Sequence, residues 1–225
     1  MNAIRAIFSK QLSDLPKNVA VSLLYVLFPA MAFVMGSMMG YMDVYAGTFA
    51  AMFVGATPMI AICNTVAEDR EYKSLRFLVM AGVKPSQYLF GLAAFVLLMS
   101  LLPLAFFVWI GEFRGELLVN LAIVSVLGLI ASSILGAGIG IFSKNVQQAT
   151  AIYTPFMMIM ALLPMFASAS ETLERIAEFL FSYQVFLIAL HPEPDLIRAL
   201  VVIAANIVVL LAFFIFAYKK KGLRG

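Results

Sequence analysis

The chain has 225 residues, of which 64% are hydrophobic and 12% are charged, and its formal net charge is +3. An average soluble domain carries roughly 25% charged residues. Here the mean hydropathy is +1.02, and the charges lie between long apolar runs that occupy most of the chain. This composition excludes a soluble globule with a polar surface, and it leaves no room for a separate soluble domain. It favours an integral membrane protein.

The N-terminal residues have helical periodicity but are too polar to span a membrane. Arg5, Lys10, Gln11 and Asp14 separate apolar residues at helical spacing, which are Ile4, Ile7, Phe8, Leu12 and Leu15. This pattern predicts an interfacial amphipathic helix over about 3–15, with its apolar face in the acyl boundary. Pro16 is expected to end it. A frayed tail is the alternative.

Six apolar runs follow, each long enough to cross about 30 Å of hydrocarbon, which takes about 20 residues. They cover about 19–39, 44–66, 86–110, 117–142, 147–167 and 196–218. The first run begins after Pro16 and no convincing cleavage site follows it, so we expect this span to remain in the mature protein. The predicted fold class is all-α integral membrane with six transmembrane helices, in one domain over 1–225.

The basic residues predict the orientation of these spans. With the N-terminus inside, three of the 15 Lys and Arg residues fall outside, namely Arg114, Arg175 and Arg198. The other 12 fall in the cytoplasm, at Arg5, Lys10, Lys17, Arg70, Lys73, Arg76, Lys84, Lys144, Lys219, Lys220, Lys221 and Arg224. Cytoplasmic loops carry such an excess of positive charge. We therefore expect both termini in the cytoplasm and an even number of spans.

The loop between the second and third spans is dense in charge. From Glu68 to Arg76 the charge alternates in sign, while Tyr72, Leu75, Leu78 and Val79 keep helical spacing. A short amphipathic helix on the cytoplasmic surface is expected, and i,i+4 charge pairs support it by only a few tenths of a kcal/mol each. Its charged face suits a soluble partner; a solvated connecting turn is the alternative.

Two segments resemble ABC transporter type-2 permeases, the membrane subunits of ABC exporters. One is the run 67–75 (AEDREYKSL) with the turn 82–86 (GVKPS), and the other is 136–149 (GAGIGIFSKNVQQA). In that family the first segment forms the coupling helix that contacts a separate ATPase subunit. The resemblance assigns this role to Glu68, Asp69, Arg70, Glu71, Lys73, Ser74 and Arg76. In the arrangement of its helices the resemblance covers the whole chain, although its local motifs are degenerate.

The resemblance implies a permease subunit of an ATP-driven exporter in the cell membrane, of bacterial origin, that works as a homodimer or paralogous heterodimer. It further implies a pathway lined by spans one, two and five. No G-x-x-x-x-G-K-[ST] phosphate loop occurs in the sequence. We therefore expect no enzyme activity and no cofactor in this chain, with ATP and Mg on the partner ATPase. The bilayer is a further partner, and no nucleic acid is expected.

The segment before the last span contains two pieces too short to cross a membrane. Ser168 and Glu171 have capping-box spacing, and a second apolar stretch covers 183–190. We expect short outer helices, which either enter the outer leaflet and return on a protein surface or rest on the membrane. His191 is the only histidine, and a ligand or proton-relay role is not favoured.

The fourth span carries a stripe of small residues, Ser132, Gly136 and Gly140, at the four-residue spacing that permits close helix packing in lipid. Ionisable residues are nearly absent from the middle of the spans, which argues against an ion-coupled carrier. Cys63 is the only cysteine, so no disulfide and no cysteine-based metal site are expected. No catalytic constellation or metal site is predicted.

Several functions remain open at this point. An apolar pathway suits a hydrophobic or amphipathic substrate, such as a peptide, a lipid-like molecule or a drug. One alternative is a non-transporting immunity or binding protein, which would not need the charges at 68–76. Another is the substrate-capturing subunit of a vitamin uptake transporter.

Overall fold

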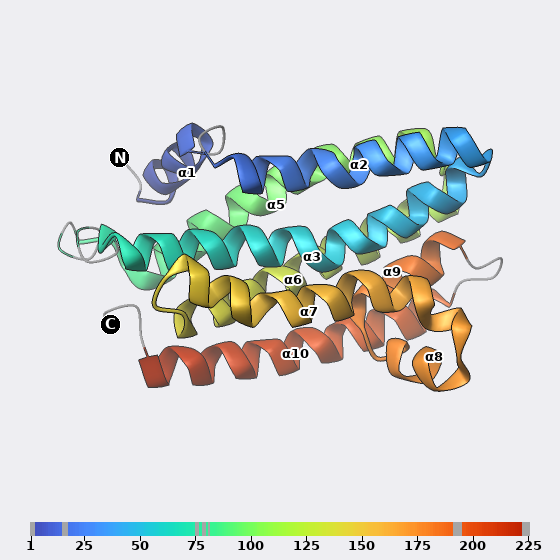
Figure 1. Ribbon diagram of the computed structural model, residues 1–225. Helices are drawn as coiled ribbons and strands as arrows, with labels where there is room; N and C mark the ends of the chain where they lie inside the picture. The colour runs from blue at the N-terminus through green and yellow to red at the C-terminus, as the bar shows by residue number, and fades with distance from the viewer. Residues whose placement is uncertain are drawn as a thin grey trace.

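The chain forms a bundle of long helices that lie side by side (Figure 1). The structure is a computed structural model and describes residues 3–14, 18–74, 77, 80, 82–190 and 195–221. The helices are α1 (Ala3–Asp14), α2 (Val19–Met39), α3 (Met42–Glu71), α5 (Pro85–Ile110), α6 (Gly115–Phe142), α7 (Val146–Phe166), the 3-10 helix η2 (Ala167–Ala169), α8 (Glu171–Ala177), α9 (Phe181–Leu190) and α10 (Leu196–Lys221). Six of them are long and apolar enough to cross a membrane, namely α2, α3, α5, α6, α7 and α10. The predicted all-α fold with six spans is confirmed.

Helix α3 is the centre of the bundle. Its apolar window is 94% buried, whereas that of α10 is 11% buried. Small residues let neighbouring helices approach α3: a Cβ on Gly55 would lie 2.7 Å from the backbone oxygen of Met160 on α7, and one on Gly47 would lie 2.8 Å from Cβ of Ala189 on α9. The other elements therefore pack around α3.

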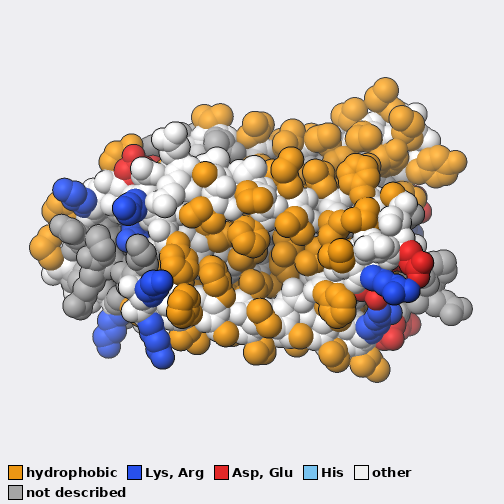
Figure 2. All heavy atoms as spheres, turned by 60° about the horizontal axis from the view of Figure 1, so that its bottom comes forward, with side chains coloured by type: hydrophobic (Ala, Val, Ile, Leu, Met, Phe, Trp, Pro, Cys, Tyr) orange, Lys and Arg blue, Asp and Glu red, His pale blue; other side chains and the backbone are white. Residues whose placement is uncertain are grey.

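The two ends of the bundle are distinguished by the helices that lie there. Figure 1 places α1, the last turn of α3 and the last turn of α10 at one end, which we name the α1 end. Helices α8 and α9 lie toward the opposite end, named here the α9 end. Between the ends, the face in Figure 2 is covered largely by hydrophobic side chains, while charged side chains gather at its two extremities. Such an apolar belt suits contact with the hydrocarbon of a bilayer.

Turn chemistry explains how consecutive spans reverse direction. Helix α2 ends at Met39 and is capped by Gly40. The φ of Gly40, 78°, lies in the left-handed region, and its N–H donates to the carbonyl of Gly36. Glycine adopts this conformation without the steric cost that other residues meet. Helix α3 then begins at Met42, so the reversal between the first two spans needs very few residues.

Three features differ from those expected: the end of α3, the surface that covers α1 and the N-cap of α8. Helix α3 does not end near position 66 but continues to Glu71. Helix α1 packs on α5: Ile7 is 3% exposed, and the rings of Phe8 and Phe95 are 5.3 Å apart. The expected capping box of Ser168 and Glu171 is wrong, because Ser170 is the N-cap residue of α8 and makes no side-chain cap hydrogen bond.

Candidate functional site

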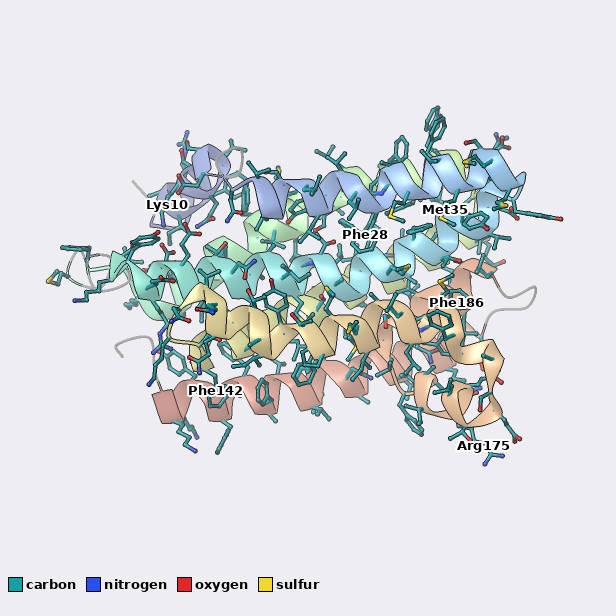
Figure 3. The ribbon with its side chains drawn as sticks, viewed as in Figure 1. Lys10, Phe28, Met35, Phe142, Arg175 and Phe186 are labelled. Carbon is teal, nitrogen blue, oxygen red and sulfur yellow. The ribbon has the colours of Figure 1, made fainter. Side chains whose placement is uncertain are left out.

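The last turn of α3 contains a buried acidic side chain that links three helices. Asp69 is 4% exposed. Its Oδ1 accepts a hydrogen bond of 2.6 Å from Nζ of Lys10 on α1, and its Oδ2 accepts one of 2.7 Å from the hydroxyl of Tyr88 on α5. Lys10 reaches from α1 toward α3 in Figure 3. A buried carboxylate is tolerated when it is paired and hydrogen-bonded in this way, so Asp69 ties α3 to α1 and α5.

The next two residues make contacts to other helices. The guanidinium of Arg70 donates to the backbone carbonyl of Ile141, in the last turn of α6. Oε2 of Glu71 accepts a 3.0 Å hydrogen bond from the N–H of Val146, the first residue of α7. That N–H is one of the groups a helix leaves without an internal acceptor, and the helix dipole favours an anion there. Consecutive residues 69–71 therefore join α3 to α1, α5, α6 and α7.

The turn between α6 and α7 is closed by its own side chains. Asn145 is the N-cap of α7, and its Oδ1 accepts a 2.8 Å hydrogen bond from the N–H of Gln148. Oε1 of Gln148 accepts a 2.8 Å bond from the N–H of Lys144. These reciprocal bonds hold the short turn rigid, so the contact of Glu71 with α7 is made to a preformed helix end.

The remaining residues of the expected coupling helix have separate positions. Glu68 is partly buried on the last turns of α3, Lys73 is exposed with a φ of 59°, and Ser74 is half-buried. Arg76 lies outside the described residues. The structure therefore brings Asp69, Arg70 and Glu71 into contacts within the chain, rather than leaving them free on one surface.

An exposed apolar surface follows the end of α3. Tyr72 is 70% exposed, Phe77 66% and Met80 73%. Ser74, Phe77 and Met80 have helical backbone. We name Tyr72, Lys73, Phe77 and Met80 the α3-end surface. Large apolar side chains with this exposure at a polar end of a bundle mark a surface that can contact a partner.

The small-residue stripe of α6 lies against α3. A Cβ on Gly136 would overlap the backbone oxygen of Met59, and one on Gly140 would lie 2.8 Å from Cβ of Val66. The hydroxyl of Ser132 accepts a 3.2 Å hydrogen bond from the N–H of Met59 and donates one of 3.3 Å to the carbonyl of Gly55. These bonds lie beside Pro58, where α3 lacks one backbone donor. A neighbouring serine thus satisfies backbone groups near a proline in a membrane helix.

The short helices occupy the α9 end. Most of α9 is buried against the bundle, including Phe181, Val185 and Ile188, whereas α8 is largely exposed. Arg198 on α10 pairs with Glu178 at 2.7 Å, which holds the α8–α9 link to the last span. This burial agrees with helices that re-enter on a protein surface. His191, which precedes the last span, lies outside the described residues.

Two residues of the candidate site, Lys10 and Tyr88, were not evident in the sequence. The partners of Asp69 come from positions 59 and 19 residues away, at Lys10 and Tyr88. Neither residue belongs to a motif, because Lys10 lies in a segment expected at the membrane surface and Tyr88 in the first turn of an apolar span. Among the described residues, no group of three or more His, Cys, Asp or Glu side chains is arranged to hold a metal ion.

Comparison with known proteins assigns the chain to a family. A search of curated proteins returned no match. Residues 1–219 match the family described as "ABC-2 family transporter protein". The match covers nearly the whole chain, including all six candidate spans. The chain therefore belongs to the ABC-2 transporter family and is a multi-pass membrane protein, the permease subunit of an ABC transporter.

Proposed function

We propose that this permease exports a hydrophobic or amphipathic substrate across the cell membrane by alternating access, with ATP and Mg²⁺ bound on a separate ATPase subunit. Membership of the ABC-2 family implies that ATPase, and the sequence contains no phosphate-binding loop of its own. Family membership favours this function over an immunity protein or a vitamin-capturing subunit. Direction, substrate and a bacterial origin are parts of the proposal.

The α1 end is proposed to face the cytoplasm. It holds the basic residues of α1, the end of α3 and the end of α10, and 12 of the 15 Lys and Arg residues belong to the side that includes it. Positive residues favour the cytoplasmic side. In this orientation both termini are cytoplasmic and α8 and α9 lie at the outer face.

The observation that carries the proposal is the set of contacts made by residues 69–71. The ATPase would bind the α3-end surface, whose apolar side chains are exposed. Movement of that surface would act on the last turn of α3, and Asp69, Arg70 and Glu71 would pass it to α1, α5, α6 and α7. The proposed coupling role is thereby divided between an exposed contact surface and hydrogen bonds to the neighbouring helices.

A second copy of the permease, or a paralogue, is proposed to complete the pathway. Helix α3 is buried within the single chain, so it offers little surface to another copy. Helices α2 and α7 have exposed faces, and α7 carries the polar residues Thr150, which is exposed, and Thr154, which is half-buried. Their hydroxyls bond back to carbonyls of α7, which limits the cost of burying them in a dimer interface or exposing them in a pathway. We assign the pathway to α2 and α7.

Co-purification with candidate ATPases encoded nearby tests the proposal. The wild-type chain should retain an ATPase, and the double variant Phe77→Asp/Met80→Asp should lose it, because two charges would enter an apolar contact. Phe179→Asp is the matched control, since Phe179 is 73% exposed but lies between α8 and α9. A chain that purifies alone under all conditions, or a partner retained equally by both variants, would contradict the proposal.

Cysteine labelling in whole cells tests the orientation. In a background in which Cys63 is replaced by Ala, Lys144→Cys should react with a membrane-impermeant maleimide only after the membrane is opened. Arg114→Cys, which is at the other end of α6, should react in intact cells. The reverse pattern would place the α1 end outside.

A further inference from the structure

A cavity of about 470 Å³ with both polar and apolar walls lies at the α1 end, between α1, α2, α3 and α5. Its walls include Lys10, Gln11, Asp14, Tyr25, Glu68 and Phe95. Its size is within the range of small-molecule sites in proteins, which combine an apolar wall with a few polar groups. Asp69 of the α3 turn and Tyr72 of the α3-end surface also line the cavity, but their contacts described above leave its space empty of protein.

The walls of this cavity hold polar side chains that make no hydrogen bond to the described residues. Gln11 is 7% exposed, lies on α1 and lines the cavity. Within the described part of the chain its side-chain amide makes no hydrogen bond. The hydroxyl of Tyr25, which also lines the cavity, is buried and has no hydrogen-bond partner among the described residues. A buried polar group left without a partner costs free energy. A ligand or water in the cavity would supply the missing bond.

One carboxylate of the cavity favours a cation. The described residues that line it include the acidic Asp14, Glu68 and Asp69 and the basic Lys10. Lys10 is already bonded to Asp69 at 2.6 Å. Glu68 forms no hydrogen bond or ion pair with the described residues. Its carboxylate is therefore available to a positively charged group.

An apolar groove of about 540 Å³ adjoins the cavity and runs between α2 and α5. Tyr25 lines both spaces, and the groove continues along Val26, Pro29, Ala30 and Leu102. Val26 and Leu102 are 62% and 69% exposed on the apolar side of the bundle. A ligand that fills both spaces has a polar head at the α1 end and a hydrocarbon tail between two spans.

We infer that the cavity and groove together bind an amphiphile with an ammonium head group, the head beside Glu68 and Gln11 and the tail between α2 and α5. This inference rests on the proposed function only for its substrate class, hydrophobic or amphipathic. Two sources share this chemistry, a phospholipid with an ammonium head from the bilayer and a cationic amphiphile from the cytoplasm. Binding needs no ATPase, so its failure is distinct from failure of the exporter proposal.

Equilibrium dialysis of the full chain in dodecyl maltoside, with radiolabelled dodecyltrimethylammonium and protein-free micelles as the blank, tests the inference. We expect saturable binding of one molecule per chain. Glu68→Gln, which keeps the side-chain shape, should weaken affinity about fivefold, as expected for one partly screened charge pair. Gln11→Leu should also weaken it. Glu116→Gln, at the α9 end of α6, is the control and should leave affinity unchanged.

A second pair of variants tests the groove. Ala30→Phe would fill the groove and should weaken binding of the dodecyl compound more than that of its hexyl homologue. Ala205→Phe, on an exposed face of α10, should change the binding of neither compound.

Displacement of the bound compound by phospholipid distinguishes the two sources of ligand. Displacement by phosphatidylethanolamine but not by diacylglycerol would identify the bilayer as a source of ligand; absence of displacement would indicate the cytoplasmic source. Non-saturable binding, or affinity equal in wild type and Glu68→Gln, would overturn the inference.

Discussion

Lys10 and Asp69 are 59 residues apart in the sequence, and Nζ of the first lies 2.6 Å from Oδ1 of the second. The lysine side chain is 41% exposed and the carboxylate side chain 6% exposed. The pair therefore joins a helix at the surface of the bundle to its buried central helix. Because Tyr88 bonds the same carboxylate, one side chain of α3 positions both α1 and α5.

Removing the charge of Asp69 should lower stability. Asp69→Asn keeps an acceptor for Tyr88 but loses the ion pair with Lys10, and we expect the free energy of unfolding to fall by about 1–3 kcal/mol. SDS titration of the purified chain measures it. Lys10→Met combined with Asp69→Asn should cost less than the sum of the single changes, because the two residues interact. Additive costs would show that the pair contributes nothing.

Gly136→Ala should destabilise the packing of α6 on α3. The new methyl group would overlap the backbone oxygen of Met59, and backbone in a packed helix cannot move aside easily. We expect a loss of about 1–3 kcal/mol. Gly138→Ala is the matched control, since its methyl group would meet the ring of Phe213, a side chain that can turn. Equal losses in SDS titrations would contradict the close approach of the two backbones.

Ser132→Ala should cost about 1 kcal/mol, the scale of a hydrogen bond between membrane helices. Its hydroxyl bonds Met59 and Gly55 on α3. The neighbouring Ser133→Ala should have a smaller effect, because the Ser133 hydroxyl donates only to Leu129 in its own helix. The difference in unfolding free energy between these two variants measures the contact across the interface. A larger loss for Ser133→Ala would contradict this assignment.

Much of the fold could be predicted from the sequence because apolar runs of membrane length are a strong signal. The six spans, and the short helices before the last one, follow from length and hydropathy. The continuation of α3 to Glu71 could not be predicted. Alternating charges resemble an exposed loop helix, and only partners distant in sequence, such as Ile141 and Val146, explain why Arg70 and Glu71 prolong a span.

The packing of α1 against α5 could also not be predicted from the sequence. An amphipathic pattern predicts an apolar face but does not distinguish lipid from protein as the surface that covers it. In the structure Phe8 packs on Phe95 of α5, while Leu12 is 50% exposed. The candidate site likewise depends on Tyr88, whose hydroxyl meets Asp69 only through tertiary packing. Periodicity carries no information about such pairings.

Residues 69–71 are proposed to connect the ATPase to the spans. Glu71→Gln tests the connection to α7, because it removes the charge that faces the first N–H of that helix. Glu71 is exposed, so the variant should fold and retain the ATPase as the wild type does.

The most direct measurement is the ATPase rate of the purified complex in lipid, with and without an amphipathic substrate, for wild type, Glu71→Gln and the control Glu171→Gln at the α9 end. We predict that Glu71→Gln retains its ATPase partner and basal rate but loses most of the substrate-dependent change, while Glu171→Gln behaves as wild type. A complex of Glu71→Gln that responds to substrate as fully as wild type would contradict the account.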